Sequence, residues 1–236
     1  MKRVSSGIMR RLIGALAATV VLMNLANAAG DLVWFNGRFD NENGLASERN
    51  TLVSDARTYD NFSLPSGYNQ VTGLLGHFFV SDVVGAPVYW EIRQGAAPGT
   101  GGTLIASGTQ GGATYTAIGS AFGLTIYEIR MKLDTPVNLA SNTVYWMTMA
   151  PVGNGSGRAF VCTTNGAGAI GSPIGGDDGL FDSAYFGVSW GAASVFVGTG
   201  EANFAYGVQA IPEPASMLAL GAGLAGLLGL RRRARK

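Results

Sequence analysis

The chain contains few of the side chains that enzymes most often use for catalysis. Among its 236 residues there is one histidine, His77, and one cysteine, Cys162. A Ser-His-Asp or Cys-His site would have to use His77, and a structural zinc site usually needs several such ligands. Both residues lie in strand-like segments, 76–79 and 160–163, so we expect a structural histidine and a buried, unreactive thiol. The sequence therefore predicts no catalytic residue.

Three carboxylates beside a glycine-rich segment are the only candidates for a metal site. Asp177, Asp178 and Asp182 follow or flank the glycines at 175, 176 and 179. Calcium accepts about six to eight oxygen ligands, which a flexible acidic loop can supply. Aspartate beside glycine is also the ordinary composition of a solvated turn. We expect no cofactor, and calcium is the one metal that the sequence leaves open.

The aromatic residues raise the question of sugar binding. Trp34, Trp90, Trp146 and Trp190 could stack on sugar rings if they were exposed. Two of them, Trp90 and Trp146, lie in alternating segments where an indole usually packs in the core, and we expect burial for all four. A glycosidase would need two carboxylates on either side of a cleft. The acidic residues are too scattered in the sequence to identify such a catalytic pair.

The segments that must position these residues indicate an all-β fold. At 127–133, apolar residues at odd positions alternate with charged residues at even positions, as in a half-buried strand. Glycine-dense stretches at 95–102 and 166–179 are typical of loops. We predict about nine to eleven strands in a single β-sandwich or jelly-roll-like domain spanning 29–210. Further strands are expected at 32–36, 59–64, 71–80, 88–93, 143–150, 158–163, 184–190 and 203–209.

The charge of this central region argues against nucleic acid as a partner. The full chain has a formal net charge of +1, with 16 Lys+Arg and 15 Asp+Glu. Nine of the basic residues lie in 1–28 and 231–236, which leaves 7 against 15 acidic residues, or −8, between 29 and 214. Nucleic-acid binding would need a clustered basic face. An acidic surface is ordinary for a secreted domain.

The N-terminal residues have the three parts of a secretory signal peptide. Four basic side chains within 1–11 precede an apolar stretch at 12–25. Ala26 and Ala28 then form an A-x-A site, so cleavage by signal peptidase would leave Ala29 or a neighbour as the new N-terminus. We therefore assign 1–28 as a signal peptide, which implies export across the inner membrane.

Residues 211–236 have a second three-part arrangement. The sequence Pro212-Glu213-Pro214 precedes an apolar segment, 215–230, that contains no charged residue. As a helix, its 16 residues would span roughly 24 Å, somewhat less than a bilayer core of about 30 Å. A basic cluster directly after an apolar run is typical of the cytoplasmic end of a membrane span. This cluster consists of Arg231, Arg232, Arg233, Arg235 and Lys236.

This order of motif, span and basic cluster resembles the PEP-CTERM sorting signal of Gram-negative bacteria that produce exopolysaccharide. The resemblance implies that the inner-membrane enzyme exosortase recognises Pro212–Pro214 and processes the chain there. The chain would be held transiently by a single C-terminal transmembrane helix, and would then reach the cell surface or the extracellular space. Short segments of the central region, such as 60–64 and 88–93, also resemble uncharacterised β-sandwich domains that commonly precede such tails.

The resemblance implies a structural or adhesive role at the cell surface or in an extracellular matrix, in association with exopolysaccharide as in a biofilm. Two alternatives remain open. A carbohydrate-binding module would present an exposed, coplanar row of tryptophan and tyrosine on one sheet face. A polysaccharide hydrolase would bring His77 or two aspartates together in a cleft, and a solvent-inaccessible His77 would exclude the histidine version.

Overall fold

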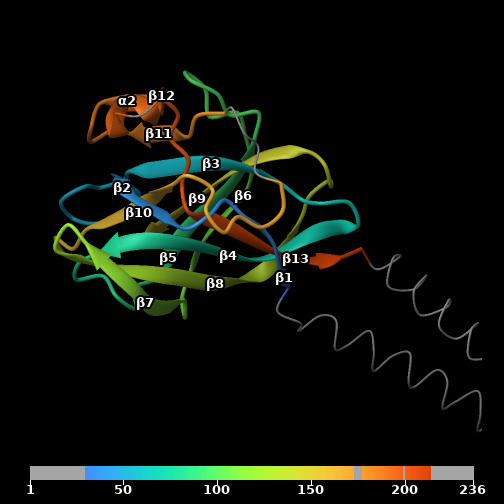
Figure 1. The fold of residues 1–236 in the computed structure, drawn as a ribbon, viewed down its shortest axis with the longest axis horizontal. Helices are drawn as coiled ribbons and strands as arrows, with labels where there is room; N and C mark the ends of the chain where they lie inside the picture. The colour runs from blue at the N-terminus through green and yellow to red at the C-terminus, as the bar shows by residue number, and fades with distance from the viewer. Residues whose placement is uncertain (1–29, 173–176, 199, 214–236) are drawn as a thin grey trace, which may run out of the picture.

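The computed structural model describes residues 30–172, 177–198 and 200–213, and these form two antiparallel β-sheets packed face to face (Figure 1). The predicted all-β sandwich is thus confirmed. The larger sheet has seven strands: β1 (Asp31–Phe35), β2 (Phe39–Ala46), β4 (Tyr68–Val80), β7 (Thr114–Ala121), β8 (Leu124–Asn138), β10 (Ala159–Thr164) and β13 (Tyr206–Pro212). The smaller has six: β3 (Arg57–Ser63), β5 (Val88–Gln94), β6 (Thr103–Gln110), β9 (Val144–Pro151), β11 (Leu180–Ser183) and β12 (Val188–Ala192).

The long strand β4 organises the seven-stranded sheet. β8 pairs along one of its edges, while β13 and β10 share the other edge, with β13 beside 68–76 and β10 beside 78–80. β1 pairs with β13, so the first and last described strands lie side by side. The order of the other sheet is β12-β11-β3-β9-β5-β6, and the short helix α2 (Ser194–Val197) follows β12.

Alternating side chains give each sheet a buried inner face and an outer face. In β8, Ile129, Met131 and Leu133 are buried, whereas the outward Glu128 and Arg130 are partly exposed, as the alternation predicted. Burial of the inner faces supplies the hydrophobic driving force for the sandwich. The largest fully buried side chains of this core are Trp34, Phe62, Leu64, Leu74, Phe78, Ile92, Ile129, Leu133, Phe204 and Tyr206.

The first part of one predicted strand is wrong, and several strands were not predicted. Residues 184–187 form a tight turn between β11 and β12 rather than part of a strand at 184–190, and Gly187 has a positive φ of 67°. β6 and β7 are largely exposed along their length, and β2 is rich in polar residues. These strands lack the apolar alternation that marks a half-buried strand, because they pack little surface against the core.

Several predicted segments fall outside the described residues. These are the signal peptide 1–28, the apolar segment 215–230 and the basic cluster 231–236. Within the described parts of the chain, no helix has the length and apolar character needed to cross a membrane. The individual residues concerned are Ala26, Ala28, Ala29, Pro214, Arg231, Arg232, Arg233, Arg235 and Lys236.

Candidate functional site

The predicted sorting motif begins where the seven-stranded sheet ends. Pro212 is the last residue of β13 and is paired with Tyr68 of β4. The backbone N–H of Glu213 donates a hydrogen bond to the carbonyl oxygen of Gly67 at 2.8 Å. Proline cannot donate to a sheet ladder, so a strand terminus is a position where it is tolerated. The folded domain therefore holds the first two residues of the motif, and Pro214 lies beyond the described residues.

The four tryptophans do not form an exposed row. Trp34 and Trp90 belong to the core between the sheets, with 1% and 7% of their surface exposed. Trp146 is buried on the outer face of the six-stranded sheet, in a cluster with Tyr59. Trp190 is only partly buried and its ring lies 4.7 Å from that of Tyr59. Burial is confirmed for the first three, and Trp190 is the exception.

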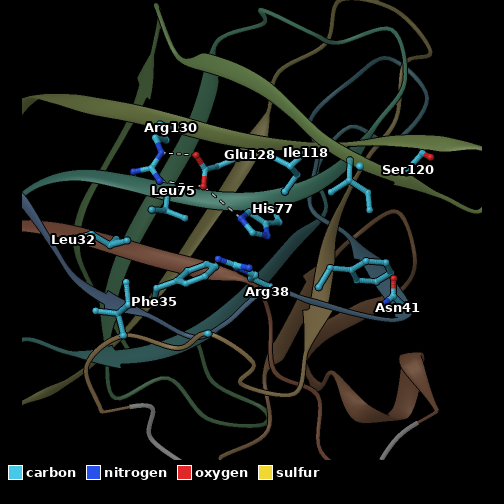
Figure 2. Close-up of a pocket in the computed structure, with 15 residues that line it drawn as sticks. Leu32, Phe35, Arg38, Asn41, Leu75, His77, Ile118, Ser120, Glu128 and Arg130 are labelled. Carbon is cyan, nitrogen blue, oxygen red and sulfur yellow. Dashed lines mark hydrogen bonds and ion pairs between the residues drawn. The ribbon is translucent and has the colours of Figure 1, made fainter.

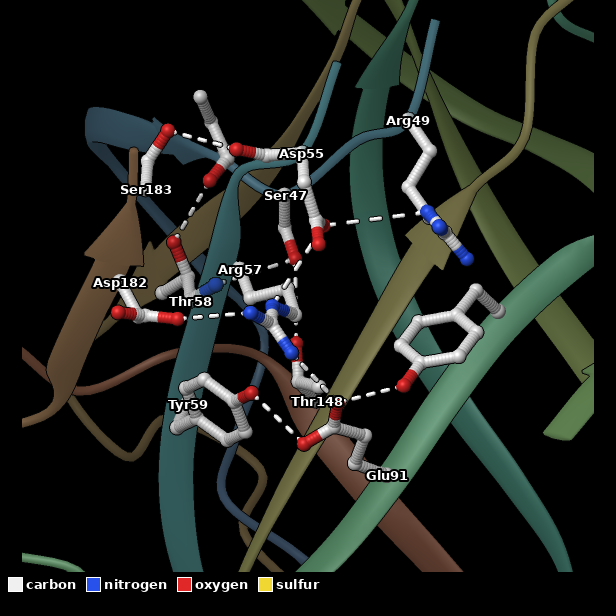
Figure 3. A network of polar contacts seen from close by, with 12 residues as sticks. Ser47, Arg49, Asp55, Arg57, Thr58, Tyr59, Glu91, Thr148, Asp182 and Ser183 are labelled. Atoms are coloured by element: carbon white, nitrogen blue, oxygen red, sulfur yellow. Dashed lines mark hydrogen bonds and ion pairs between the residues drawn. The ribbon is translucent and has the colours of Figure 1, made fainter. Parts of the chain in front are cut away.

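A carboxylate on the outer face of the six-stranded sheet is the centre of a polar network (Figure 3). Glu91 of β5 is 1% exposed and accepts hydrogen bonds from Arg57 Nη1 at 2.6 Å and Tyr59 Oη at 2.9 Å. Tyr89 Oη and Arg93 Nε donate to the same carboxylate, each at 2.5 Å. Four donors from two strands therefore converge on one buried carboxylate, an arrangement that sequence analysis did not predict.

The electrostatics of this network favour a structural role. Burial alone would raise the pKa of Glu91, but hydrogen bonds from Tyr89 and Arg93 and the charge of Arg57 hold this pKa below its ordinary value. The carboxylate is therefore ionised at neutral pH. Arg57 also contacts Asp182 Oδ2 at 2.8 Å. Because its oxygens already accept four hydrogen bonds, Glu91 is poorly placed to take a proton from a substrate or to bind a metal.

The three aspartates predicted as calcium candidates face three different partners. Asp177 accepts a hydrogen bond from Asn61 Nδ2 at 2.7 Å, and Asp182 pairs with Arg57. Asp178 accepts from the backbone N–H of Ser194 at the start of α2, at 3.1 Å. Over the described ranges, no group of three or more histidine, cysteine, aspartate or glutamate side chains could hold a metal ion. Part of the glycine-rich loop, 173–176, is not described, and calcium binding stays a prediction.

His77 lies in the wall of a pocket of about 540 Å³ on the outer face of the seven-stranded sheet (Figure 2). The residue is 5% exposed, which argues against a hydrolase that would use this histidine. Its Nε2 lies 3.5 Å from Glu128 Oε2, and Glu128 is bound in turn by Arg130 Nε at 2.5 Å. Burial lowers the pKa of His77, and the nearby charge of Glu128 only partly opposes this. The imidazole is thus neutral at neutral pH and faces a carboxylate.

The single thiol is inert. Cys162 is fully buried in a cluster with Phe79, Ile126 and Ala205 on the outer side of the same sheet. Burial raises the pKa of Cys162 far above the physiological range, so the reactive thiolate does not form. The expectation of a buried cysteine is confirmed.

Comparison with known proteins identifies one segment of the chain. Residues 210–233 match the family model of the PEP-CTERM protein-sorting motif. No curated protein matches the chain. The matched segment starts within β13 and includes Pro212, Glu213 and the apolar residues that follow. The chain therefore carries a PEP-CTERM sorting motif directly behind an all-β sandwich domain.

Proposed function

We propose that this chain is an exosortase substrate whose β-sandwich serves as a structural or adhesive component of the cell surface or extracellular matrix, in association with exopolysaccharide. The observation that carries the proposal is the match of 210–233 to the sorting motif. Such a motif implies export and membrane anchoring before release to the surface. The association with exopolysaccharide is inferred from the resemblance of the chain to PEP-CTERM proteins of bacteria that produce exopolysaccharide.

The chemistry of the domain supports a structural role over the two alternatives, a polysaccharide hydrolase and a carbohydrate-binding module. Glu91 is fully engaged by four donors, and His77 is almost inaccessible and faces a carboxylate. A hydrolase would need one of these groups, or a pair of aspartates, open to a cleft. A carbohydrate-binding module would need exposed aromatic rings, whereas Trp34 and Trp90 support the core.

The sorting step is tested by replacing Pro212-Glu213-Pro214 with three alanines in the full chain. We expect the cell to accumulate unprocessed, membrane-held precursor, because exosortase would lose its recognition sequence. Immunoblots of membrane and extracellular fractions measure the result. Pro98→Ala, in an exposed turn between β5 and β6, is the matched control and should be processed normally. Normal release of the triple-alanine chain would contradict the proposal.

The matrix association is tested separately with the unaltered chain. Processed protein should co-sediment with the polysaccharide matrix of producing cells and should appear free in the medium of cells that make no exopolysaccharide. An identical distribution in the two strains would contradict the association, while leaving the sorting step intact.

A further inference from the structure

The pocket beside His77 is held open by fixed backbone contacts. Its floor is formed by β4 and β8, which contribute Leu75 and Ile126, and its rim by the segments on either side of Arg38 and Ile170. Phe35 and Ile170 exchange two backbone hydrogen bonds of 2.9 Å each. The N–H of Arg38 donates to the carbonyl oxygen of Ala167 at 2.8 Å. The rim is therefore preorganised, and the volume of about 540 Å³ suits a small molecule.

Arg38 is an unpaired cation in an acidic domain. Within the described ranges it contacts no carboxylate within ion-pair distance, and its side chain is exposed at this pocket. The other ionic groups of the pocket are Arg130 and Glu128, which neutralise each other, so the site keeps one net positive charge. Five other arginines each contact a carboxylate: Arg49, Arg57, Arg93, Arg130 and Arg158.

The imidazole of His77 has an unused hydrogen-bonding atom. An ionised Glu128 can only accept hydrogen bonds, so the proton of the neutral imidazole belongs on Nε2, which faces it. The other ring nitrogen, Nδ1, is then an acceptor, and it is buried without a hydrogen-bond partner among the described residues. Buried polar atoms in native proteins are rarely left unpaired. Figure 2 shows this ring between Glu128 and Arg38.

We propose that this pocket binds a small hydroxylated carboxylate. Arg38 would bind the carboxylate, and a ligand hydroxyl would donate a hydrogen bond to Nδ1 of His77. The apolar body of the ligand would lie on Leu75, Ile126 and Ile118. A free hydroxy acid and the acid unit of a polysaccharide share this chemistry. The inference concerns binding alone and does not rest on the proposed matrix role.

The arrangement favours a singly charged ligand. One unpaired guanidinium compensates one negative charge, and planar carboxylates match its donor geometry. A phosphate dianion would bring a second charge close to Glu128 without a second free cation to offset it. A neutral sugar would leave Arg38 unpaired. The apolar floor favours ligands that present an apolar face, as a sugar ring or an alkyl chain does.

Isothermal titration of the full chain in detergent tests the proposal with D-glucuronate and 3-hydroxyhexanoate. Their neutral counterparts, D-glucose and hexane-1,3-diol, keep the hydroxyls and remove the charge. We expect saturable binding of at least one acid and none of the neutral compounds. Preference for glucuronate would indicate a sugar acid, and preference for hydroxyhexanoate an aliphatic acid. Arg38→Ala should weaken binding roughly ten- to hundredfold, the usual effect of losing hydrogen bonds to a charged group.

Lys132→Ala is the matched control, because Lys132 is exposed and also lacks a contacting carboxylate in the described residues. Its affinity for the acids should stay within about twofold of the unaltered chain. The proposal is overturned if neither acid binds, if the neutral compounds bind as tightly, or if Arg38→Ala and Lys132→Ala behave alike. Equal competition by inorganic phosphate would also overturn it. Processing of Arg38→Ala at the sorting motif should be normal, which separates this test from that of the proposed function.

Discussion

The Glu91 network and the His77 pocket are built from the same kinds of residue on the outer faces of the two sheets. Each contains a carboxylate, arginines and aromatic rings (Figures 2 and 3). In the network, Glu91 accepts hydrogen bonds from four side chains and Arg57 contacts two further carboxylates, Asp55 and Asp182. In the pocket, Arg38 contacts no carboxylate and His77 Nδ1 has no partner among the described residues.

The two regions differ in what their unsatisfied polar atoms face. In the network, Arg57 Nε and Asp55 Oδ1 make no hydrogen bond but lie 3.5 Å apart as an ion pair, whereas His77 Nδ1 has no such partner among the described residues. A buried network whose members pair with each other stabilises one packed arrangement and has little capacity left for a ligand. A partly unsatisfied group beside a cavity is stabilised further when a ligand supplies the missing partner. We therefore expect opposite effects when charged residues are replaced: a loss of stability in the network, and a loss of ligand binding in the pocket.

Removing the charge of Glu91 should have the largest effect. Glu91→Gln leaves the partly buried Arg57 and Arg93 beside a neutral amide, and it should lower the free energy of unfolding by about 3–5 kcal/mol. Chemical unfolding followed by tryptophan fluorescence measures this. Glu128→Gln in the pocket is the matched control. Its pair with Arg130 is more exposed, so a loss of about 1 kcal/mol or less is expected. Equal losses would show that the comparison is mistaken.

A third carboxylate, that of Asp60, shows how burial changes a pKa when no cation among the described residues lies nearby. Asp60 lies between the sheets, fully buried, and accepts hydrogen bonds from Asn36 Nδ2 at 2.8 Å and from the N–H of Phe204 at 2.5 Å. Burial raises the pKa of Asp60 to about 7, and these hydrogen bonds only partly oppose the shift. The pKa of Glu91 is lowered instead, because hydrogen bonds from Tyr89 and Arg93 and the charge of Arg57 outweigh its burial.

The raised pKa of Asp60 predicts that stability falls as pH rises. Between the unfolded value of 3.8 and about 7, the folded protein holds a proton that the unfolded chain has released. The contribution of Asp60 to stability is therefore fully present below pH 4 and is lost as pH rises through 7, by about 4 kcal/mol in total. Asp60→Asn should abolish this component. Glu48 and Asp55 shift in the same direction but remain in the variant, so the difference between the two unfolding curves isolates Asp60. A constant difference from pH 4 to 8 would contradict the prediction.

Sequence patterns predicted the features that depend on neighbouring residues. The alternation in 127–133 follows from one buried face of β8, and the sorting motif is a contiguous string of residues. The strands β6 and β7 were missed because neither face is well buried. The turn at 184–187 was mistaken for a strand because its flanking residues, in β11 and β12, do have strand character.

The polar sites depend on strand order, which local patterns do not encode. Glu91 and Arg57 are 34 residues apart in sequence, and Arg57 and Asp182 are 125 apart. They meet because β3 lies next to β11 on one side and β9 on the other, with β5 one strand further. Likewise, Arg38 reaches the wall formed by His77 only because β4 lies in the centre of its sheet. The strand pattern around Tyr89 and Arg93 indicates that Glu91 points outward. It does not indicate that Arg57 is its partner.

The smallest effect concerns His77, and its sign is opposite to that of Asp60. Burial lowers the folded pKa of His77, with Glu128 opposing the shift and Arg130 and Arg38 adding to it. Below the unfolded value of 6.5 the unfolded chain binds a proton that the folded protein excludes, so stability is lost as pH falls through this range. His77→Gln keeps a side chain able to donate to Glu128 and should remove this loss.

Unfolding measured between pH 5 and 7 for the two chains checks the prediction for His77. A second measurement follows the pKa of His77 when a hydroxylated carboxylate is added and binds in the pocket. A hydroxyl that donates to Nδ1 stabilises the neutral imidazole, so ligand binding should lower the pKa of His77 further. A neighbouring negative charge alone would raise this pKa instead. The direction of the shift, read from the histidine ring resonances during titration, therefore tells whether the ligand satisfies Nδ1 or only pairs with Arg38.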